Sequence, residues 1–571
     1  MEKPWLRFYD PRTPPTLKYP ELPLDHFLDQ AARDYGGRTA MTFVLRYLLG
    51  GRLRLGGAWT YRQLREAVDR CATGLAGLGV RKGDRVALML PNTPQYVVTF
   101  MAAMRLGAVV VNTNPTYTAP ELRHQLADSG AETIVLLNLF LPKLRAVQAE
   151  LPSLKRVVVC AVDDMLRTPA RQLVRRAMRR EPDWVEPVAG PDTTLFADLL
   201  HAPAEPPQVE RAPGDLALFQ YTGGTTGVPR AAMLTHRNLV ANTLQCLAWL
   251  ADGRPGDERM MCALPFFHVY GMTVGMLCST AMAANMIIIP NPRPIENVMM
   301  VLQRERATVF PGVPAMYISI VNHPKADSYN LTSVRACLSA AAPLPIEVQE
   351  QFGKITGGRL VEGYGLTETS PLTHANPIYG ERKPGAIGVP VSDVEAKIID
   401  LDTGADIALG SEASGELVVR GPQVMAGYWN HPDETARAID ADGWFHTGDI
   451  ATVDANGYFA IVDRKKDMII ASGYKVLPRE VEEVLFTHPD VQEAAIVGIR
   501  DPYRGETVKA FVVPKAGAEP TEVAIITFCR ERLAPYKVPR QVEFRSELPK
   551  TAIGKVLRRV LVEEERQRAA G

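Results

Sequence analysis

The sequence lacks an excess of charge of either sign, because 64 Lys and Arg balance 64 Asp and Glu among 571 residues. A chain without net positive charge is poorly suited to binding nucleic acid through bulk electrostatics. Cysteine is scarce: there are seven, widely spaced and without a CxxC pair. This pattern argues against a disulfide framework or a zinc site and favours reduced thiols in a cytoplasmic protein.

Long apolar runs are also missing. Residues 1–8 contain no apolar run of signal-peptide length. The uncharged stretch 271–290 is interrupted by Gly, Ser, Thr and Asn and ends in the strand-like run 286–289. A buried helix that leads into a short buried strand fits this stretch better than a membrane span.

The composition, 46% hydrophobic and 22% charged, is typical of a folded globular chain, and the length predicts at least two domains. From about residue 59 helical and strand-like segments alternate, including helices at 61–78 and 95–106 and strands at 85–90 and 108–111. The predicted fold class is α/β. We expect layered α/β subdomains with a β-rich subdomain at about 385–463 in a domain spanning 1–463, and a small mobile α+β domain at 464–571.

A loop rich in glycine and threonine follows the strand-like run 217–220. Glycines let backbone N–H groups turn inward and threonine hydroxyls add donors, so the loop can form an anion nest for phosphates. It is not a Walker P-loop, because no Gly-Lys-Ser/Thr follows at the required spacing. Taken alone, such a loop is equally well a hairpin turn. Its residues are Thr222, Gly223, Gly224, Thr225, Thr226 and Gly227, and it runs on to Arg230.

Further motifs follow this loop along the chain. They read Leu-Pro-Phe-Phe-His-Val-Tyr-Gly at 264–271, Phe-Pro-Gly-Val-Pro at 310–314, Glu-Gly-Tyr-Gly-Leu-Thr-Glu-Thr-Ser at 362–370, Gly-Trp-Phe-His-Thr-Gly-Asp at 443–449, Asp-Arg-Lys-Lys-Asp at 463–467, Ala-Ser-Gly-Tyr-Lys at 471–475 and Pro-Lys-Thr-Ala-Ile-Gly-Lys at 549–555. With these motifs, in this order and over almost the whole chain, the sequence resembles the adenylate-forming superfamily. That superfamily includes acyl-CoA synthetases, luciferases and peptide-synthetase adenylation domains.

The resemblance implies a reaction in which a carboxylate joins the α-phosphorus of ATP and pyrophosphate leaves. Two anions must approach each other, which costs about 4 kcal/mol per pair of unit charges at 4 Å near a protein surface. Cations and preorganised donors must offset this repulsion. By resemblance, Lys555 contacts both the substrate carboxylate and the α-phosphate, a bridging position that suits a compact ammonium group.

The resemblance also implies a nucleotide site with Mg²⁺. Glu368 is expected to bind the magnesium ion with Thr222, and Thr367 to contact the α-phosphate. Tyr364 has a flat face that can stack on adenine. The other residues assigned to ATP or AMP are Arg230, Ala341, Gly363, Asp449 and Arg464, of which Asp449 and Arg464 are expected at the ribose.

Three further positions follow from the same resemblance. His268 is expected between the acyl pocket and the reacting carboxylate, where it positions the substrate. Lys466 matches the hinge about which the C-terminal domain turns after the first step, so that coenzyme A can reach the acyl-adenylate. Gly473 would let the pantetheine arm pass closely, because glycine has no Cβ.

Two positions depart from the family's pattern. Arg230-Ala231 stands where Lys-Gly is usual, which keeps the charge but replaces a point charge by a planar fork. Ala340-Ala341 stands where Gly-Gly is common, and alanine is strained there if the backbone needs a positive φ. These departures concern the fine geometry at the pyrophosphate and the adenine, and they leave open a nucleotide-binding scaffold with little catalysis.

Two stretches concern the acid substrate. Residues 112–122 resemble the corresponding stretch of long-chain fatty acyl-CoA synthetases, so we expect a fatty acid, ATP and CoA as substrates. Residues 165–180 carry Arg171, Arg175 and Arg179 at helical spacing, which fits either peripheral contact with an anionic membrane or a solvated helix face. A medium-chain or aryl-CoA ligase, an acyl-AMP ligase that feeds a carrier protein, and assembly as a homodimer stay open.

Overall fold

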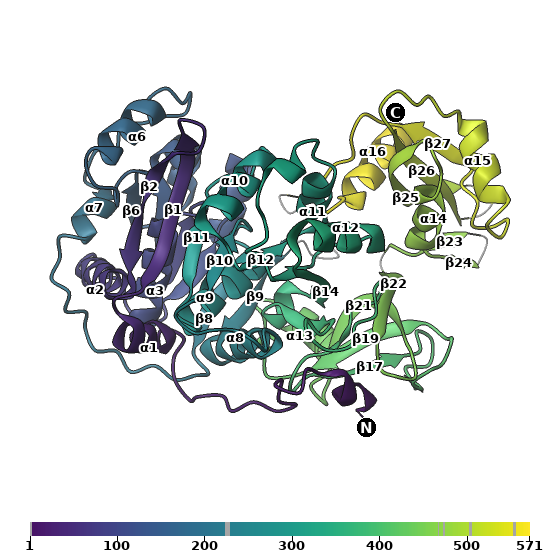
Figure 1. The fold of residues 1–571 in the computed structure, drawn as a ribbon, viewed down its shortest axis with the longest axis horizontal. Helices are drawn as coiled ribbons and strands as arrows, with labels where there is room; N and C mark the ends of the chain where they lie inside the picture. The colour runs from purple at the N-terminus through teal and green to yellow at the C-terminus, as the bar shows by residue number, and fades with distance from the viewer. Residues whose placement is uncertain are drawn as a thin grey trace. The chain divides into compact units, whose positions relative to one another are not determined.

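The computed structural model describes residues 3–222, 229–465, 467–471, 474–501, 505–551 and 555–570. The chain packs into two compact units, a larger one of residues 6–395 and 420–443 and a smaller one of 1–5, 396–419 and 444–571. Figure 1 shows both as mixtures of helices and strands, as the predicted α/β class requires. The predicted domain boundary at 463/464 falls inside the smaller unit and stays a prediction.

The first sheet of the larger unit has the order β20-β9-β8-β4-β3-β5-β6-β7. From β8 to β7 neighbouring strands are parallel, whereas β9 and β20 add antiparallel to the edge. The strands are β3 (Arg85–Met89), β4 (Val109–Asn112), β5 (Thr133–Leu137), β6 (Arg156–Cys160), β7 (Thr193–Leu195), β8 (Leu216–Thr222), β9 (Arg230–Thr235) and β20 (Gly427–Tyr428).

The second sheet of the larger unit has the order β16-β15-β14-β13-β12-β10-β11-β1-β2. It is parallel from β14 to β1, with antiparallel strands at both edges. The strands are β1 (Thr39–Leu48), β2 (Leu53–Thr60), β10 (Arg259–Cys262), β11 (Asn285–Ile288), β12 (Val309–Gly312), β13 (Ala336–Ser339), β14 (Arg359–Gly365), β15 (Leu372–Ala375) and β16 (Val389–Pro390).

The helices of the larger unit lie against these sheets. They are α1 (His26–Tyr35), α2 (Tyr61–Gly77), α3 (Pro94–Arg105), α4 (Ala119–Ser129), α5 (Leu141–Arg145), α6 (Ala170–Met178), α7 (Phe196–Leu199), α8 (His236–Trp249), α9 (Cys278–Ala281), α10 (Ile295–Glu305), α11 (Pro314–Val321), α12 (Ile346–Thr356) and α13 (Pro432–Ala438). A π-helical segment, η4 (Gly271–Leu277), runs into α9, and β11 follows, which confirms the buried helix and strand expected at 271–290. No helix of the described residues is long and apolar enough to cross a bilayer.

The smaller unit contains two further sheets. One has the order β18-β17-β19-β21-β22, in which the pairs β17–β18, β19–β21 and β21–β22 are antiparallel. The other has the order β24-β23-β26-β25, with β27 parallel to β26. The strands are β17 (Glu395–Ile399), β18 (Asp406–Ile407), β19 (Gly415–Arg420), β21 (Phe445–Val453), β22 (Phe459–Arg464), β23 (Ile469–Ala471), β24 (Tyr474–Val476), β25 (Val491–Asp501), β26 (Gly505–Pro514) and β27 (Gln541–Phe544). The helices α14 (Pro478–Phe486), α15 (Glu522–Arg530) and α16 (Arg558–Ala570) accompany the second sheet, which gives the expected α+β arrangement.

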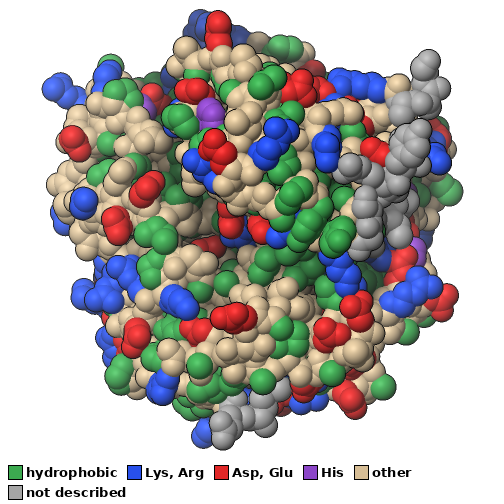
Figure 2. Space-filling model, turned by 90° about the vertical axis from the view of Figure 1, so that its right-hand side faces the viewer, with side chains coloured by type: hydrophobic (Ala, Val, Ile, Leu, Met, Phe, Trp, Pro, Cys, Tyr) green, Lys and Arg blue, Asp and Glu red, His purple; other side chains and the backbone are tan. Residues whose placement is uncertain are grey.

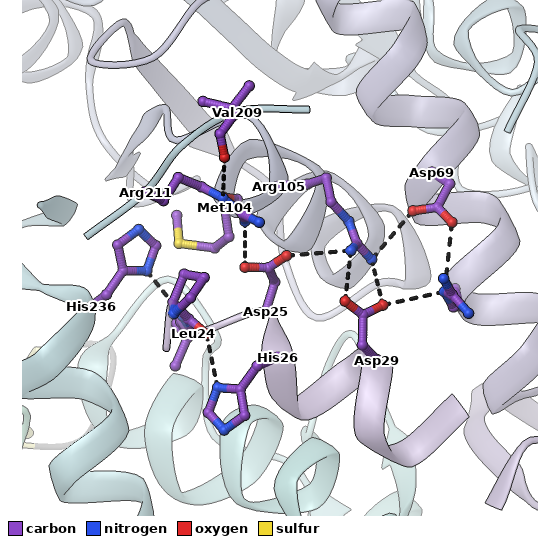
Figure 3. Close-up of polar contacts among 12 residues, drawn as sticks. Leu24, Asp25, His26, Asp29, Asp69, Met104, Arg105, Val209, Arg211 and His236 are labelled. Carbon is purple, nitrogen blue, oxygen red and sulfur yellow. Dashed lines mark hydrogen bonds and ion pairs between the residues drawn. The ribbon is translucent and has the colours of Figure 1, made fainter. Parts of the chain in front are cut away.

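A buried ion network fastens helix α1 inside the larger unit (Figure 3). The Asp25 carboxylate, whose side chain is 1% exposed, lies 2.5 Å from Arg211 and 3.5 Å from Arg105. Arg105 also pairs with Asp29 on α1 and Asp69 on α2, at 2.8 and 3.2 Å. Buried charges are tolerated only when they are paired in this way, so the network holds α1, α2 and α3 in one arrangement.

On the face drawn in Figure 2, acidic and basic side chains are interspersed.

Candidate functional site

Glu368 lies directly after strand β14, in the 3₁₀ turn Thr367–Thr369. The residue is 8% exposed. Its Oε1 accepts a hydrogen bond of 2.8 Å from the Tyr428 hydroxyl, and its carbonyl accepts one of 2.8 Å from the Met425 N–H. Burial and the Glu368 charge raise the pKa of Tyr428, so the phenol stays a donor. The carboxylate predicted to bind Mg²⁺ is thus held in one orientation.

The end of β14 also presents Gly363 and Tyr364, and its register with β15 pairs them with Ala375 and His374. The Tyr364 and His374 rings meet edge to face, with centroids 6.0 Å apart. Gly365 packs so closely that a Cβ would lie 1.8 Å from the Pro371 carbonyl oxygen. Glycine is therefore required directly after Tyr364, and the backbone rather than side-chain bulk sets the position of this strand end.

Arg230 opens strand β9 opposite Thr222, which ends β8. The residue is 8% exposed, its guanidinium lies 4.7 Å from the centre of the Tyr428 ring, and it pairs with Glu434. Tyr428 therefore connects Arg230 with Glu368. A planar guanidinium stacks on an aromatic face better than an ammonium does, which gives a physical reason for arginine at this position.

The loop predicted to cradle phosphates is only partly described. Thr222 lies at the end of β8, while Gly223, Gly224, Thr225, Thr226 and Gly227 lie outside the described residues. Tyr428 and Glu434 were missed by sequence reasoning. They are about 200 residues from Arg230, and no local pattern marks them as its partners.

Ala341 has a φ of +75°, two residues after strand β13 ends. The left-handed region costs a residue with a Cβ roughly 1–2 kcal/mol relative to glycine. The strain expected at this departure from the family's pattern is therefore present in the backbone.

His268 lies in the turn between β10 and the segment η4, where it is half-buried. Its Nδ1 accepts a hydrogen bond of 3.3 Å from the Tyr270 N–H. The Asn92 side chain holds the preceding residues, since Nδ2 donates to the carbonyls of Cys262 and Leu264 and Oδ1 accepts from the Phe266 N–H. The turn that carries His268 is therefore held by Asn92, a residue distant in the sequence.

A chain of buried side chains joins this turn to β8. The Tyr96 hydroxyl donates to Asn112 Oδ1 at 2.6 Å, Asn112 Nδ2 donates to Gln220 Oε1 at 2.9 Å, and Gln220 Nε2 donates to the Phe267 carbonyl at 3.1 Å. Tyr96, Asn112 and Gln220 are each at most 4% exposed. The network ties the end of β8, two residues before Thr222, to the turn that carries His268. In the sequence, the indication of this network is Asn112, a polar residue at the end of the apolar run 109–111, because a buried polar side chain needs hydrogen-bond partners.

A narrow apolar cavity lies in the same unit. Its wall includes Val274 and Cys278 from the helical segment that follows His268, and Leu338 from β13. Cys246 of α8 and Cys337 of β13 contribute two more thiols. Burial raises the pKa of Cys337, so this thiol is a neutral apolar wall group.

In the smaller unit, Asp449 on β21 and Arg464 at the end of β22 are direct partners in the strand register. Arg464 Nε lies 3.1 Å from Asp449 Oδ1, and Asp449 is 3% exposed. The turn before Asp449 is fixed by Glu416, which accepts from the Gly448 N–H at 3.1 Å and from Lys465 Nζ at 2.9 Å. The two residues predicted at the ribose are thus brought together.

Lys555 belongs to a short segment that folds back on itself. The Thr551 N–H donates to the Lys555 carbonyl at 2.8 Å, and the Lys555 N–H donates to Thr551 Oγ1 at 3.1 Å. Lys550 and Val556 form an antiparallel bridge beside this pair. The predicted hinge Lys466 and the predicted CoA-access residue Gly473 lie outside the described residues.

Comparison with known proteins places the whole chain in one family. Residues 28–429 match the AMP-binding enzyme family and residues 480–555 its C-terminal domain. The chain is 43% identical over 572 residues to a long-chain-fatty-acid–CoA ligase of Bacillus subtilis (strain 168), covering 99% of this chain and 98% of the relative. It is 38% identical over 505 residues to a feruloyl-CoA synthase of Amycolatopsis sp, covering 88% and 93%.

Solved structures agree with this assignment. The anthranilate CoA ligase AuaEII in complex with anthranoyl-AMP has a TM-score of 0.81 at 26% identity, covering 97% of this chain and 99% of that one. The resemblance to the adenylate-forming superfamily is confirmed, and the chain belongs to the AMP-binding enzyme family.

Proposed function

We propose that this protein is an AMP-forming long-chain fatty acid–CoA ligase. It converts a fatty acid, ATP and CoA into acyl-CoA, AMP and pyrophosphate through an acyl-adenylate. The observation that carries the proposal is the 43% identity over 99% of the chain to a long-chain-fatty-acid–CoA ligase. The placement of Glu368 beside Tyr428 and of Asp449 beside Arg464 supports it, because each gives a predicted nucleotide-binding residue a defined position.

The nucleotide is bound by carboxylates and donors from several strands. Asp449 accepts from the vicinal ribose hydroxyls and Arg464 holds that carboxylate in place. Glu368 and Thr222 are the residues that would hold a Mg²⁺ ion. Bound there, the ion would neutralise part of the phosphate charge.

In the adenylation step a carboxylate oxygen attacks the α-phosphorus, the bond to the β-phosphate oxygen breaks, and pyrophosphate leaves. The Lys555 ammonium lies against both reacting anions and Thr367 donates to the α-phosphate, so negative charge is offset where it develops. His268 orients the carboxylate from a turn that Asn92 and Gln220 fix in place.

The acyl tail enters the cavity beside Val274 and Cys278. Apolar walls favour an alkyl chain because its burial gains about 0.8 kcal/mol per methylene. The cavity is narrow, so a long chain must displace wall side chains as it enters. In the second step the CoA sulfur attacks the acyl carbonyl and AMP leaves, after a domain turn about Lys466 that opens a path past Gly473.

An aryl-CoA ligase is the second candidate, since the feruloyl-CoA synthase relative is 38% identical over 88% of this chain. A panel of palmitate, octanoate and ferulate, measured for both pyrophosphate release and CoA consumption, tests the choice. We expect palmitate to give the highest kcat/KM and both signals in equal amounts. Ferulate as the best acid would favour the aryl ligase. Pyrophosphate release without CoA consumption would identify an acyl-AMP ligase. The absence of acid-dependent pyrophosphate release would identify a nucleotide-binding scaffold with little catalysis.

A cytoplasmic location with peripheral membrane contact through residues 165–180 is part of the proposal. Arg171 and Arg175 lie 3.6 and 3.0 Å from the buried Asp163, and Arg179 lies 3.1 Å from Glu186. These arginines have partners within the protein. The lipid-facing set is therefore the 53% exposed Leu173 with the exposed Arg176 and Arg180.

Sedimentation with vesicles containing anionic lipid tests this surface. The double variant Arg176→Glu/Arg180→Glu should lose most vesicle binding, whereas Arg62→Glu, at an exposed position on α2, should bind as the parent does. Equal binding by all three proteins would contradict the proposal. A homodimer is a separate prediction, which the sedimentation equilibrium mass of the parent decides.

A further inference from the structure

The described residues on either side of Lys555, 548–551 and 555–561, are here called the Lys555 segment, and apolar contacts hold its two ends. Leu548 at its start and Leu561 at its end are 4% and 0% exposed and belong to one apolar cluster. Between them the segment bonds to itself, since the Leu557 N–H donates to the Pro549 carbonyl at 2.8 Å. On one side of Lys555, Lys550 connects the segment to the sheet of its lobe, since its Nζ lies 2.7 Å from Glu493 Oε1 on β25. A connection on the other side comes from helix α16.

Arg558, three residues after Lys555 and first in helix α16, supplies that connection. Its Nε and Nη2 donate to the two carboxylate oxygens of Glu482 at 3.1 and 2.5 Å, a bidentate pair. Glu482 lies on α14, is 7% exposed, and also accepts from the Ile496 N–H of β25 at 2.8 Å. Figure 1 shows α14 and α16 beside β25. The base of the Lys555 segment is thus anchored to the helix and sheet of its lobe.

The third nitrogen of the same guanidinium binds next to the predicted hinge. Arg558 Nη1 lies 3.1 Å from Asp467 Oδ2. The Asp467 N–H in turn donates to the Arg464 carbonyl at 3.0 Å. Arg558 and Asp467 are 22% and 21% exposed, so their pair is only partly screened by solvent. One side chain therefore connects the Lys555 segment, the body of the lobe and the residue that follows position 466.

We propose that Arg558 is a positioning residue for adenylation, which sets the direction of Lys555 and makes the Lys555 segment turn together with the lobe about the hinge. The proposal rests on the role of Lys555 in the proposed function. Arginine is required because its planar fork holds two carboxylates at once, whereas a lysine ammonium can hold only one of them closely. Asp467→Asn should weaken the same connection from its other end.

The test separates the two half-reactions in one protein. Adenylation is measured as pyrophosphate release from palmitate and ATP, and thioester formation as CoA consumption with supplied palmitoyl-AMP. Misplacing a catalytic group by about 1 Å can cost about 100-fold, so we expect Arg558→Ala to slow adenylation by about 30- to 100-fold. Thioester formation should change less than about threefold, because it does not use Lys555. Arg558→Lys should recover part of the adenylation rate.

Arg568→Ala is the matched control. Arg568 lies on the same helix and pairs with Glu543 and Glu565 at 2.6 and 2.9 Å, away from Lys555. We expect this variant to leave both half-reactions within about twofold of the parent. Equal loss of both steps in Arg558→Ala would mean that Arg558 only stabilises the lobe, and no loss in either step would overturn the proposal as well.

A double variant decides whether Arg558 acts through Lys555. If it does, Arg558→Ala should cause no further loss of adenylation in a Lys555→Ala background. Multiplied losses would overturn the proposal and assign Arg558 an independent role. If Lys555→Ala alone spares adenylation, the proposed role of Lys555 fails first and the inference about Arg558 fails with it.

Discussion

Two regions of the molecule hold their predicted site residues in different ways. In the larger unit Glu368 and Arg230 are 8% exposed and contact Tyr428 from a distant strand, and in the smaller unit Asp449 is 3% exposed and pairs with Arg464. The Lys555 segment, also in the smaller unit, leads into Arg558, whose ion pair with Asp467 is about one-fifth exposed. Buried hydrogen bonds hold geometry tightly at any ionic strength, whereas partly exposed ion pairs keep a segment in place and respond to salt. The contrast suits buried residues that bind the nucleotide and a Lys555 segment that, in the proposed function, turns away between the two steps.

The largest expected effect is at the lobe. Lys555→Ala should lower the rate of palmitate-dependent pyrophosphate release by about 10³-fold or more, because it removes the cation proposed to offset the charge of the two reacting anions. CoA consumption from supplied palmitoyl-AMP should stay within about threefold. If both rates fell by the same factor, the division of labour between the two units would be wrong.

At the buried carboxylate of the larger unit, Glu368→Gln removes one charge and keeps the shape of the side chain. We expect kcat/KM for ATP to fall by about 100-fold and the Mg²⁺ concentration for half-maximal rate to rise, because an amide is a weak ligand for a hard cation. Tyr428→Phe is the matched control, since it keeps the carboxylate and loses one hydrogen bond, worth roughly 1 kcal/mol. A Mg²⁺ requirement that is unchanged in Glu368→Gln would contradict the assignment.

Acid should lower the stability of the larger unit through His236. His236 Nδ1 accepts from the Leu24 N–H at 3.1 Å (Figure 3), and desolvation lowers its pKa from 6.5 to about 4. The unfolded chain therefore binds more protons between these values. The stabilisation is complete above pH 6.5 and is lost as pH falls toward 4, by about 3 kcal/mol in total.

Denaturant unfolding of the parent and of His236→Asn, measured from pH 7 to pH 4, checks this expectation. Asparagine can still accept from the Leu24 N–H but does not titrate in this range. The variant should therefore show a shallower decline of unfolding free energy with falling pH. Parallel curves for the two proteins would show that His236 does not titrate as its burial requires.

The smallest effect concerns chain length. Cys278 is 2% exposed and lines the apolar cavity, so Cys278→Leu should narrow it. Relative to octanoate, kcat/KM for palmitate should fall by about tenfold, since one methylene of space in an apolar pocket is worth roughly 10-fold or more. An equal fall for both acids would place the acyl tail elsewhere, and the thermal midpoint of the variant shows whether overpacking has unfolded it.

Local patterns predicted much of the secondary structure. The helix expected at 61–78 is α2, Tyr61–Gly77, and Thr60 with Gln63 forms a capping box at its start. The strand expected at 85–90 is β3, Arg85–Met89. Apolar periodicity and caps act over a few residues, so they can be read directly from the chain. Asp449 and Arg464 were placed together by the family resemblance, and the structure pairs them across β21 and β22.

Contacts between distant segments could not be predicted in this way. The spacing of Arg171, Arg175 and Arg179 indicated one basic face, but the fold turns them toward Asp163 and Glu186. Tyr428 and Glu434 contact Arg230 although about 200 residues separate them in the sequence, and no repeat or spacing predicts such a contact.

The order of motifs was enough to identify the family and the reaction, because each motif carries its chemistry within a few neighbouring residues. The tertiary structure alone decided what holds those residues. It placed Tyr428 between Glu368 and Arg230, and Arg558 between Glu482 and Asp467. The physical reason is that side-chain partners are chosen by packing of whole sheets and helices, which depends on the entire chain rather than on local sequence.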